Sequence, residues 1–311
     1  MRVTHGSTTP GSSRSALTIG NFDGVHRGHQ AMLERTVARA RERRLESCAL
    51  TFEPHPREFF TPATAPARLT RLRDKLELMA AAGLDRVHVA KFDAQLAALP
   101  AGRFVDAYVA HGLRAAWLLV GRDFRFGAKR GGDFPLLDQL AARHGFELEA
   151  MPEVALHGER VSSSGVRAAL AAGDLAGAER LLGRPYAMSG RIVHGEKLGR
   201  ELGFPTANLP LTRRAPLAGI FVVECRVEGE TLWRPGVASV GRRPTVNPTA
   251  SPLLEVHLLD YAADLYRRHL QVRFLRKLRD EQKYDDVPAL RAAIAGDAAL
   301  ARSYFAMKTN A

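Results

Sequence analysis

Two histidines lie in a glycine-rich turn that follows a short apolar run near the start of the chain. The turn reads Gly20-Asn21-Phe22-Asp23-Gly24-Val25-His26-Arg27-Gly28-His29. Imidazole N–H groups can donate hydrogen bonds to a phosphate and can follow charge as it moves along a polyphosphate. The apolar run 16–19 predicts a buried strand, and helical spacing begins near Gln30. A strand, a turn and a helix N-terminus together present backbone N–H groups and the positive end of the helix dipole, which predicts a phosphate site.

The spacing of this turn distinguishes it from other nucleotide-binding loops. It contains neither the G-x-G-x-x-G dinucleotide fingerprint nor a Walker A sequence. A strand followed by His26, Gly28 and His29 at a helix start is similar to the nucleotidylyltransferase signature, and Gly28 would let the backbone approach the nucleotide closely. The alternative is a turn whose histidines lie at the surface, but the pair in this context favours the functional interpretation.

Three consecutive serines precede another helical run. Ser162, Ser163 and Ser164 are good N-cap residues, and capping alone would explain them. Arg167 follows one turn later, and hydroxyls together with a guanidinium group would also bind a triphosphate. We interpret the segment as a second phosphate contact, with capping as the alternative.

A glycine-rich basic stretch in the second half leads into a segment that offers oxygen ligands. Gly195, Lys197 and Arg200 could surround phosphates through backbone N–H groups and positive charge. Thr206 and Asn208 lie two residues apart, so in an extended segment their side chains share one face and could both meet Mg²⁺ or its waters. Ordinary hydrogen bonds of a turn are the alternative, and for this pair taken in isolation they are the favoured explanation.

Glu255 lies between Leu254 and Val256 in an otherwise apolar, strand-like run. If its face lines a ligand cavity, partial desolvation would raise its basicity, as a general base requires. A solvent-facing residue on a half-exposed strand is an equal alternative.

The pattern of apolar residues changes near the middle of the chain. Over residues 15–182, short apolar strands alternate with amphipathic helices, which predicts an α/β fold with a parallel sheet and helices on both faces. Such sheets bind ligands at the carboxyl ends of their strands, where the histidine turn and the segments 53–56 and 121–127 are expected to lie. The two prolines of the segment 53–56 are expected to stop any regular structure there. After residue 183, strands separated by Gly- and Pro-rich turns predict a small antiparallel β-barrel, followed by a terminal helix over about 288–305.

The composition is that of an ordinary globular protein. Of 311 residues, 46% are hydrophobic and 25% are charged, and this length predicts two domains. Residues 1–14 are expected to form a loose polar tail without the apolar core of a signal peptide, and no apolar run is long enough to span a bilayer. Cys48 and Cys225 are the only cysteines and are expected to be small buried hydrophobes outside any disulfide framework. These features predict a cytoplasmic protein.

The net charge of +12, from 45 basic and 33 acidic side chains, raises the question of nucleic-acid binding. The cations are mostly arginines scattered along predicted helices and loops, as in residues 39–44, and such runs are usually solvated helix faces. No RNP, KH, zinc-finger or aromatic-interleaved basic motif is present in the sequence. Positive potential would also serve an enzyme that binds nucleotides and other phosphates, so we expect no nucleic-acid partner.

These motifs, in this order, resemble those of the prokaryotic bifunctional riboflavin kinase/FAD synthetases, and the likeness covers residues 16–306. The motifs are 20–29, Phe52-Glu53-Pro54-His55-Pro56, 121–127, 162–167, Gly203-Phe204-Pro205-Thr206-Ala207-Asn208 and Leu254-Glu255-Val256-His257. The resemblance implies a Rossmann-like nucleotidyltransferase domain over residues 1–183 and a riboflavin kinase barrel over residues 184–311.

In the C-terminal domain, the resemblance implies that riboflavin attacks the γ-phosphate of ATP to give FMN. Glu255 would take the hydroxyl proton, Thr206 and Asn208 would hold Mg²⁺ and phosphates, and the loop 195–200 would cover the nucleotide. Phosphoryl transfer of this kind relies on positioning and charge neutralisation more than on covalent catalysis.

In the N-terminal domain, the resemblance implies that the FMN phosphate attacks the α-phosphate of a second ATP to give FAD and pyrophosphate. His26, His29 and Arg167 would be the catalytic residues. The expected phosphate contacts are Gly20, Asn21, Phe22, Asp23, Gly28, Ser163 and Ser164, and the expected flavin contacts are Asp123, Phe124 and Phe126.

Three residues depart from the family pattern. Ser164 stands where Thr is usual but keeps the hydroxyl group. Arg242 and Arg267 replace residues that are commonly Thr and Gly, and Arg267 would cost backbone freedom if its position needs a positive φ. Two alternatives stay open: a chain with one working site, such as an FAD synthetase with a vestigial barrel, and a basic nucleic-acid-binding protein with a similar fold. No obligate protein partner is evident from the sequence.

Overall fold

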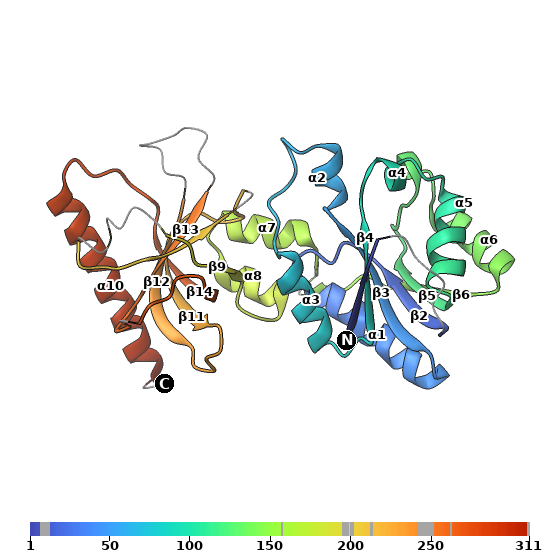
Figure 1. Cartoon of the computed structure of the whole chain (residues 1–311), viewed down its shortest axis with the longest axis horizontal. Helices are drawn as coiled ribbons and strands as arrows, with labels where there is room; N and C mark the ends of the chain where they lie inside the picture. The colour runs from blue at the N-terminus through green and yellow to red at the C-terminus, as the bar shows by residue number, and fades with distance from the viewer. Residues whose placement is uncertain are drawn as a thin grey trace. The chain divides into compact units, whose positions relative to one another are not determined.

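The computed structural model divides into two compact units, each built on a six-stranded sheet (Figure 1). The first unit comprises Met1–Pro66 and Leu72–Ser162, and the second comprises Ala67–Arg71 and Ser163–Ala311. The structure describes residues 1–6, 13–156, 158–194, 199, 202–211, 214–241, 252–261 and 263–309. The compact units part at Ser162, and the functional domain boundary expected at residue 183 stays a prediction.

The first unit contains a wholly parallel sheet, as the alternating pattern predicts. Its spatial order is β1-β4-β3-β2-β5-β6. The strands are β1 (Arg2–His5), β2 (Ser15–Ile19), β3 (Glu46–Glu53), β4 (Arg86–Lys91), β5 (Ala115–Gly121) and β6 (Glu147–Met151), and a short hairpin follows as β7 (Ala155–Leu156) and β8 (Glu159–Arg160). The helices are α1 (Arg27–Arg43), α2 (Pro56–Phe60), α3 (Leu72–Ala81), α4 (Ala94–Ala97), α5 (Ala101–Phe104), the π-helix η1 (Val105–Gly112), the 3-10 helix η2 (Ala128–Arg130) and α6 (Phe134–His144). The strand order reverses at β2, which has β3 on one side and β5 on the other, and ligands bind at such switch points.

Side-chain alternation along the strands explains why helices cover both faces of this sheet. Leu17 of β2 is buried in one cluster with Phe104 of α5 and Leu137 of α6, whereas Ala16 is buried in another cluster with Ala40 of α1. Successive residues of a strand point to opposite faces, so each face needs its own cover. The helix α1 therefore packs on one face, and α5, η1 and α6 pack on the other.

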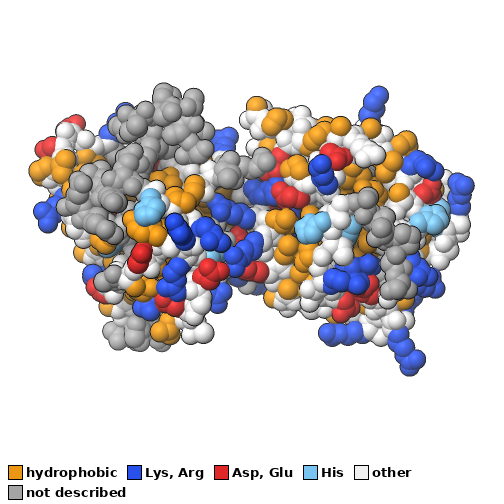
Figure 2. Space-filling view, in the orientation of Figure 1, with side chains coloured by type: hydrophobic (Ala, Val, Ile, Leu, Met, Phe, Trp, Pro, Cys, Tyr) orange, Lys and Arg blue, Asp and Glu red, His pale blue; other side chains and the backbone are white. Residues whose placement is uncertain are grey.

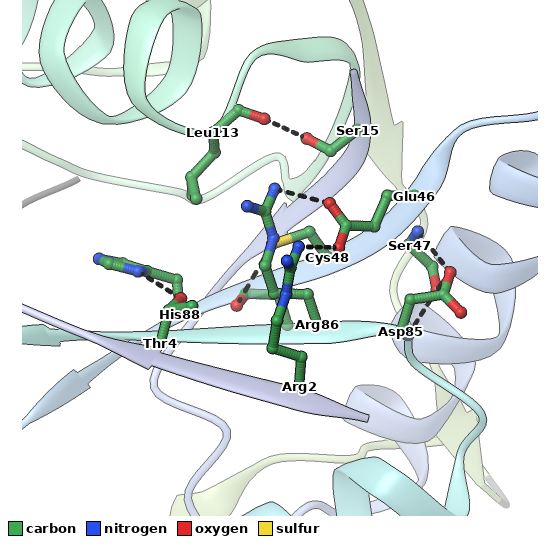
Figure 3. A network of polar contacts seen from close by, with 11 residues as sticks. Arg2, Thr4, Ser15, Glu46, Ser47, Cys48, Asp85, Arg86, His88 and Leu113 are labelled. Atoms are coloured by element: carbon green, nitrogen blue, oxygen red, sulfur yellow. Dashed lines mark hydrogen bonds and ion pairs between the residues drawn. The ribbon is translucent and has the colours of Figure 1, made fainter. Parts of the chain in front are cut away.

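The expected loose polar tail is wrong for residues 2–5, which form the edge strand β1. This strand pairs in parallel with β4, with Arg2 opposite Arg86. Figure 3 shows the Glu46 carboxylate between two guanidinium groups, 2.6 Å from Nη2 of Arg2 and 3.1 Å from Nη2 of Arg86. A short polar strand at a sheet edge has little apolar periodicity, so its pairing depends on partners far along the chain.

The second unit contains a nearly closed antiparallel barrel followed by a terminal helix, as predicted. Its spatial order is β10-β13-β12-β11-β14-β9, and a bridge between Val193 and Asn208 links the continuation of the last strand to the first. The strands are β9 (Ala187–Arg191), β10 (Ala207–Pro210), β11 (Gly219–Val227), β12 (Arg234–Gly241), β13 (Leu253–Leu258) and β14 (His269–Arg279). The helices are α7 (Ser163–Ala171), α8 (Leu175–Leu182) and α10 (Val287–Thr309). Ala298 and Ala301 of α10 pack with Val222 on the outside of the barrel.

The two cysteines are buried and unpaired, as expected. Burial raises the pKa of the Cys48 thiol to about 11, so the group is held as a neutral thiol at ordinary pH. Across the described parts of the chain, no helix combines the length and the apolar character needed to cross a membrane.

Two candidate active sites

The histidine turn connects β2 to α1 at the carboxyl edge of the parallel sheet. His26 caps α1, because its Nδ1 accepts a hydrogen bond from the backbone N–H of His29 at 3.3 Å. An accepting Nδ1 places the proton of the neutral ring on Nε2. The two imidazole rings stack, with their centroids 3.7 Å apart and their planes at 17°. The predicted pair is therefore brought together at a helix N-terminus, and the first turn of α1 carries no acidic residue to cancel the dipole.

The surroundings of His29 favour its neutral form. Burial keeps the pKa of His29 well below its usual value, and the charges of His26 and Lys75 act in the same direction. Its Nδ1 is buried and has no hydrogen-bond partner in the described part of the protein. A bound ligand could supply the hydrogen bond that this buried nitrogen of the neutral ring lacks.

The turn itself is strained and tightly packed. Phe22 and Val25 have φ of 48° and 41°, which non-glycine residues rarely adopt. Gln30 holds the far end, because its Nε2 donates to the carbonyl oxygen of Val25 at 2.8 Å. A Cβ at Gly28 would approach ring atoms of His26 to 3.2 Å, so the glycine makes room for the capping imidazole. Backbone strain of this kind gathers at ligand-binding sites.

The other predicted phosphate contacts of the turn differ in exposure. Phe22 and Asp23 are buried, whereas Gly20 and Asn21 are half-buried. The buried residues support the turn from within, and the half-buried ones keep some access to solvent. A phosphate role for each of the four stays a prediction.

Seven phenylalanines form a continuous series of ring contacts along the carboxyl edge of the sheet, here called the aromatic chain. In order they are Phe60, Phe59, Phe92, Phe52, Phe104, Phe126 and Phe124, with neighbouring centroids between 5.3 and 6.5 Å apart. Phe60 is 60% exposed, and Figure 2 shows hydrophobic side chains at the surface where α2 lies. A flat apolar ring system could stack on such a surface.

The sequence indicates only one end of the aromatic chain, Phe124 and Phe126. The sequence does not indicate the other end, Phe59 and Phe60, because the prolines of the segment 53–56 were expected to stop regular structure. That expectation is wrong for Pro56, which begins α2 with His55 as its N-cap. Proline fits the first turn of a helix because its missing N–H would have had no partner there.

Asp123 lies beside the aromatic chain in the loop after β5. Its carboxylate is 2.6 Å from Nη2 of Arg160, which also reaches Glu153 at 3.2 Å. The Asp123 side chain is largely exposed. A flavin contact by Asp123 stays a prediction.

The serine segment opens a helix, as expected. Ser163 and Ser164 are the first two residues of α7, and Arg167 lies one turn later on the same helix. The Nε of Arg167 donates to the carbonyl oxygen of Ala67 at 2.6 Å. Ser163, Ser164 and Arg167 belong to the second compact unit, whereas the histidine turn belongs to the first. That all of them contact one nucleotide stays a prediction.

In the barrel, Glu255 lies at the centre of a polar row across three strands. Its register partners are Asn208 on β10 and Ser239 on β12. Its chain neighbours Leu254 and Val256 are buried in the barrel core, so the row lies on the outer face of the sheet. Glu255 itself is half-buried.

Asn208 has a buried oxygen that lacks a protein partner. The side chain is 5% exposed, and its Oδ1 has no hydrogen-bond partner among the residues described. Thr206 is half-buried, and a Cβ at Gly199 would approach its Oγ1 to 3.2 Å. An unsatisfied buried oxygen costs free energy unless a ligand meets it, and oxygen ligands suit Mg²⁺. The pair therefore fits the predicted ion, although the described chain offers no group of three or more His, Cys, Asp or Glu that could hold a metal.

Glu281 is a second carboxylate near this row that the sequence does not indicate. It accepts a hydrogen bond from Oγ of Ser239 at 3.0 Å. Burial raises the pKa of Glu281, and the negative charge of Glu255 acts in the same direction. Glu281 follows β14 in an irregular polar segment, where no periodicity could have singled it out.

Gly195, Lys197, Arg200 and Arg242 lie outside the described residues. Arg267 has φ of 67°, so the backbone cost expected for a non-glycine residue at this position is present.

Two family models match two successive parts of the chain. A family model described as FAD synthetase matches residues 9–165, and one described as riboflavin kinase matches residues 182–305. A relative from Pseudomonas fluorescens is 52% identical over 92% of this chain and 91% of its own length, and it is named bifunctional riboflavin kinase/FMN adenylyltransferase. A relative of the same name from Escherichia coli K12 is 49% identical over 94% of this chain and 93% of its own.

A solved structure from Streptococcus pneumoniae, described as a macrolide-efflux protein, shares the fold. It has a TM-score of 0.80 and 26% sequence identity, and the match covers 96% of this chain and 98% of that one. The identity to the two named relatives extends over nearly the whole of each chain. This chain therefore belongs to the family of bifunctional riboflavin kinase/FMN adenylyltransferases.

Proposed function

We propose that this chain makes FAD from riboflavin in two steps at two separate sites. Riboflavin and ATP give FMN and ADP in the barrel, and FMN and a second ATP give FAD and pyrophosphate at the histidine turn. The observation that carries this division is that His26 and His29 lie in one compact unit while Asn208 and Glu255 lie in the other. We assign FMN adenylyl transfer to residues 1–183 and riboflavin phosphorylation to residues 184–311.

In the kinase step, the ribityl 5′-hydroxyl of riboflavin attacks the γ-phosphorus of ATP, and ADP leaves. Glu255 accepts the hydroxyl proton, which its half-buried position on the polar row supports. Thr206 and Asn208 hold Mg²⁺ and phosphate oxygens, and the orphan Oδ1 of Asn208 is the observation in favour of this. When bound, Mg²⁺ supplies charge neutralisation for the phosphates. The loop 195–200 covers the nucleotide in this proposal.

In the adenylyl step, a phosphate oxygen of FMN attacks the α-phosphorus of ATP, and pyrophosphate leaves. His26 caps α1 through its Nδ1, and neutral His29 is stacked beside it, where both rings can contact the phosphates in this proposal. Ser163, Ser164 and Arg167 stabilise the leaving pyrophosphate in this proposal.

The aromatic chain is the surface we propose for the flavin ring of FMN. Phe60 and Phe59 offer exposed rings at one end, and Phe124 and Phe126 offer stacked rings at the other. Asp123, beside the second end, would help to place the flavin. Stacking of aromatic rings supplies orientation together with apolar burial.

We place the enzyme in the cytoplasm, where buried unpaired thiols such as Cys48 and Cys225 are stable and ATP is available. Both reactions need only small-molecule substrates, so we propose no obligate protein partner and no nucleic-acid partner.

The test is to incubate the purified chain with ATP and Mg²⁺, adding either riboflavin or FMN, and to separate the flavins by chromatography. Riboflavin should yield FMN and then FAD, and added FMN should yield FAD. If FAD forms from added FMN but no FMN or FAD forms from riboflavin, a single working site is supported and the kinase half of the proposal is overturned. Absence of both products would overturn the whole proposal.

A further inference from the structure

Lys75 of α3 is a buried cation beneath the histidine turn. The residue is 2% exposed, and its Nζ donates to the carbonyl oxygen of Asn21 at 2.8 Å. The Nζ also lies 3.3 Å from Oγ1 of Thr51 on β3, which itself donates to the carbonyl oxygen of Asn21 at 3.2 Å. A helix and a strand therefore converge on one carbonyl oxygen at the entry to the turn.

The position of the Asn21 carbonyl in the chain shows which part of the turn Lys75 and Thr51 hold in place. Asn21 directly precedes Phe22, whose φ of 48° begins the strained part of the turn. Two donors at Asn21 hold this end, while Gln30 holds the other end through Val25. The strained backbone that leads to the two histidines is thus tied down on both sides.

A buried lysine is costly for stability, which makes a purely structural role a poor explanation. Removing a charge from water is unfavourable, and the hydrogen bonds that Lys75 makes offset this cost only in part. Neighbours of Lys75 in the same unit, such as Met79 of α3, are apolar and fill the core without this cost. A positive charge under a phosphate site also strengthens the field that anionic groups experience there.

We propose that Lys75 is a positioning residue of adenylyl transfer, which fixes the Asn21 carbonyl and so the histidine turn, and which adds positive charge beneath the phosphates. This inference rests on the proposed function of the turn. Lys75 does not touch the reacting atoms in this account, and it acts through Asn21 and the backbone that follows it.

The state of His29 supports the same assignment. Burial is the first cause of its lowered pKa, the charge of His26 is the second and the charge of Lys75 is the third. Around the ring, His26 stacks at 3.7 Å and Phe22 lies at 5.2 Å, both from the turn, and the charge of Lys75 acts on the ring from α3. The buried cation therefore helps to keep the imidazole neutral.

The main test compares Lys75→Met with Arg73→Met, a matched change on the same helix. Arg73 is exposed and makes an ion pair with Glu77 at 3.0 Å. Lys75→Met should lower kcat for conversion of FMN to FAD by about tenfold or more and change KM for ATP by less than about threefold, because positioning acts in the transition state. Riboflavin phosphorylation by the same chain should stay within about twofold, and Arg73→Met should leave both activities unchanged. Normal kcat in folded Lys75→Met, or an equal loss in Arg73→Met, would overturn the inference.

Thr51→Val provides a milder variant if Lys75→Met does not fold. It removes the second donor to the Asn21 carbonyl and should lower the same kcat by about threefold or more, which corresponds to a weakened hydrogen bond. The double variant should lose less than the product of the two single losses, because both act on one carbonyl. A Thr51→Val protein with unchanged kcat would contradict the positioning role.

An NMR titration of His29 separates this inference from the proposed function. Its pKa should be higher in Lys75→Met than in the wild type, and an unchanged pKa would overturn the electrostatic half of the inference. This readout needs no catalysis. A wild-type chain that makes no FAD would overturn the proposed function, while the titration would still test the action of Lys75 on the turn.

Discussion

The imidazole of His26 accepts the backbone N–H of His29, and the two rings stack with centroids 3.7 Å apart. The first histidine therefore builds the helix N-terminus on which the second one sits. Loss of His26 would remove a cap as well as a phosphate contact, whereas loss of His29 would leave the cap acceptor in place. His29 is for this reason the cleaner position at which to test the chemistry.

Acidification should destabilise the fold through His29. Its pKa is lowered in the folded chain, so below about pH 6.5 the unfolded chain binds more protons than the folded one. The free energy of unfolding should therefore be greatest above about pH 6.5 and should fall as the pH drops toward the folded-state pKa. The measurement is urea unfolding of the wild type and His29→Gln at about pH 7.5 and about pH 5.5.

The variant should lose less stability on acidification than the wild type. His88 is buried too, and its pKa is lowered by burial, so it contributes a common background in both proteins. Equal losses in the two proteins would show that His29 is not the group responsible.

Asn208 should matter for activity and not for stability. Asn208→Leu removes a buried oxygen that has no hydrogen-bond partner among the described residues, so the free energy of unfolding without ligand should rise or change by no more than about 1 kcal/mol. Phosphorylation of riboflavin should fall about a hundredfold or more, because charge stabilisation at the phosphates is lost. Urea unfolding and FMN production measure the two effects.

Ser239→Ala is the matched control on the same polar row, since Ser239 makes a hydrogen bond to Glu281 at 3.0 Å. This change should lower the free energy of unfolding by about 1 kcal/mol. A ligand-free Asn208→Leu protein that is less stable than Ser239→Ala would argue that Asn208 serves the fold.

Phe60 should contribute to FMN binding at the adenylyl site. Phe60→Ala should raise KM for FMN about fivefold, because the binding free energy of one aromatic ring contact corresponds to roughly this factor. The change should leave riboflavin phosphorylation unchanged. The control is Leu300→Ala, because Leu300 on α10 is 58% exposed, close to the 60% of Phe60. Steady-state kinetics with FMN as the varied substrate measure the effect. An unchanged KM in Phe60→Ala would remove this end of the aromatic chain from the flavin site.

The sequence predicts those parts of the molecule whose residues carry their own periodicity. The run in β2 is apolar and precedes a glycine-rich turn, and the strand spans Ser15–Ile19, close to the predicted range 16–19. The edge strand β1 escapes prediction because its short polar sequence is ordered by pairing with β4 and by the contacts of Arg2 with Glu46.

The candidate sites divide in a similar way. The histidine turn and the Thr206–Asn208 segment are recognisable because their chemistry lies within a few neighbouring residues. Lys75 and Glu281 are not, since each reaches its partners from a distant part of the chain and carries no local motif. Only their burial and tertiary contacts identify these two charged residues as parts of the candidate sites.

The central claim is that two separate sites, one at the histidine turn and one on the polar row of the barrel, carry two reactions, and crossed variants test it most directly. Glu255→Gln and His29→Ala are each supplied with ATP, Mg²⁺ and either riboflavin or FMN, and the flavin products are separated. Glu255→Gln should make no FMN from riboflavin yet convert FMN to FAD at nearly the wild-type rate. His29→Ala should accumulate FMN from riboflavin and make little FAD. Loss of both reactions in either folded variant would contradict the account.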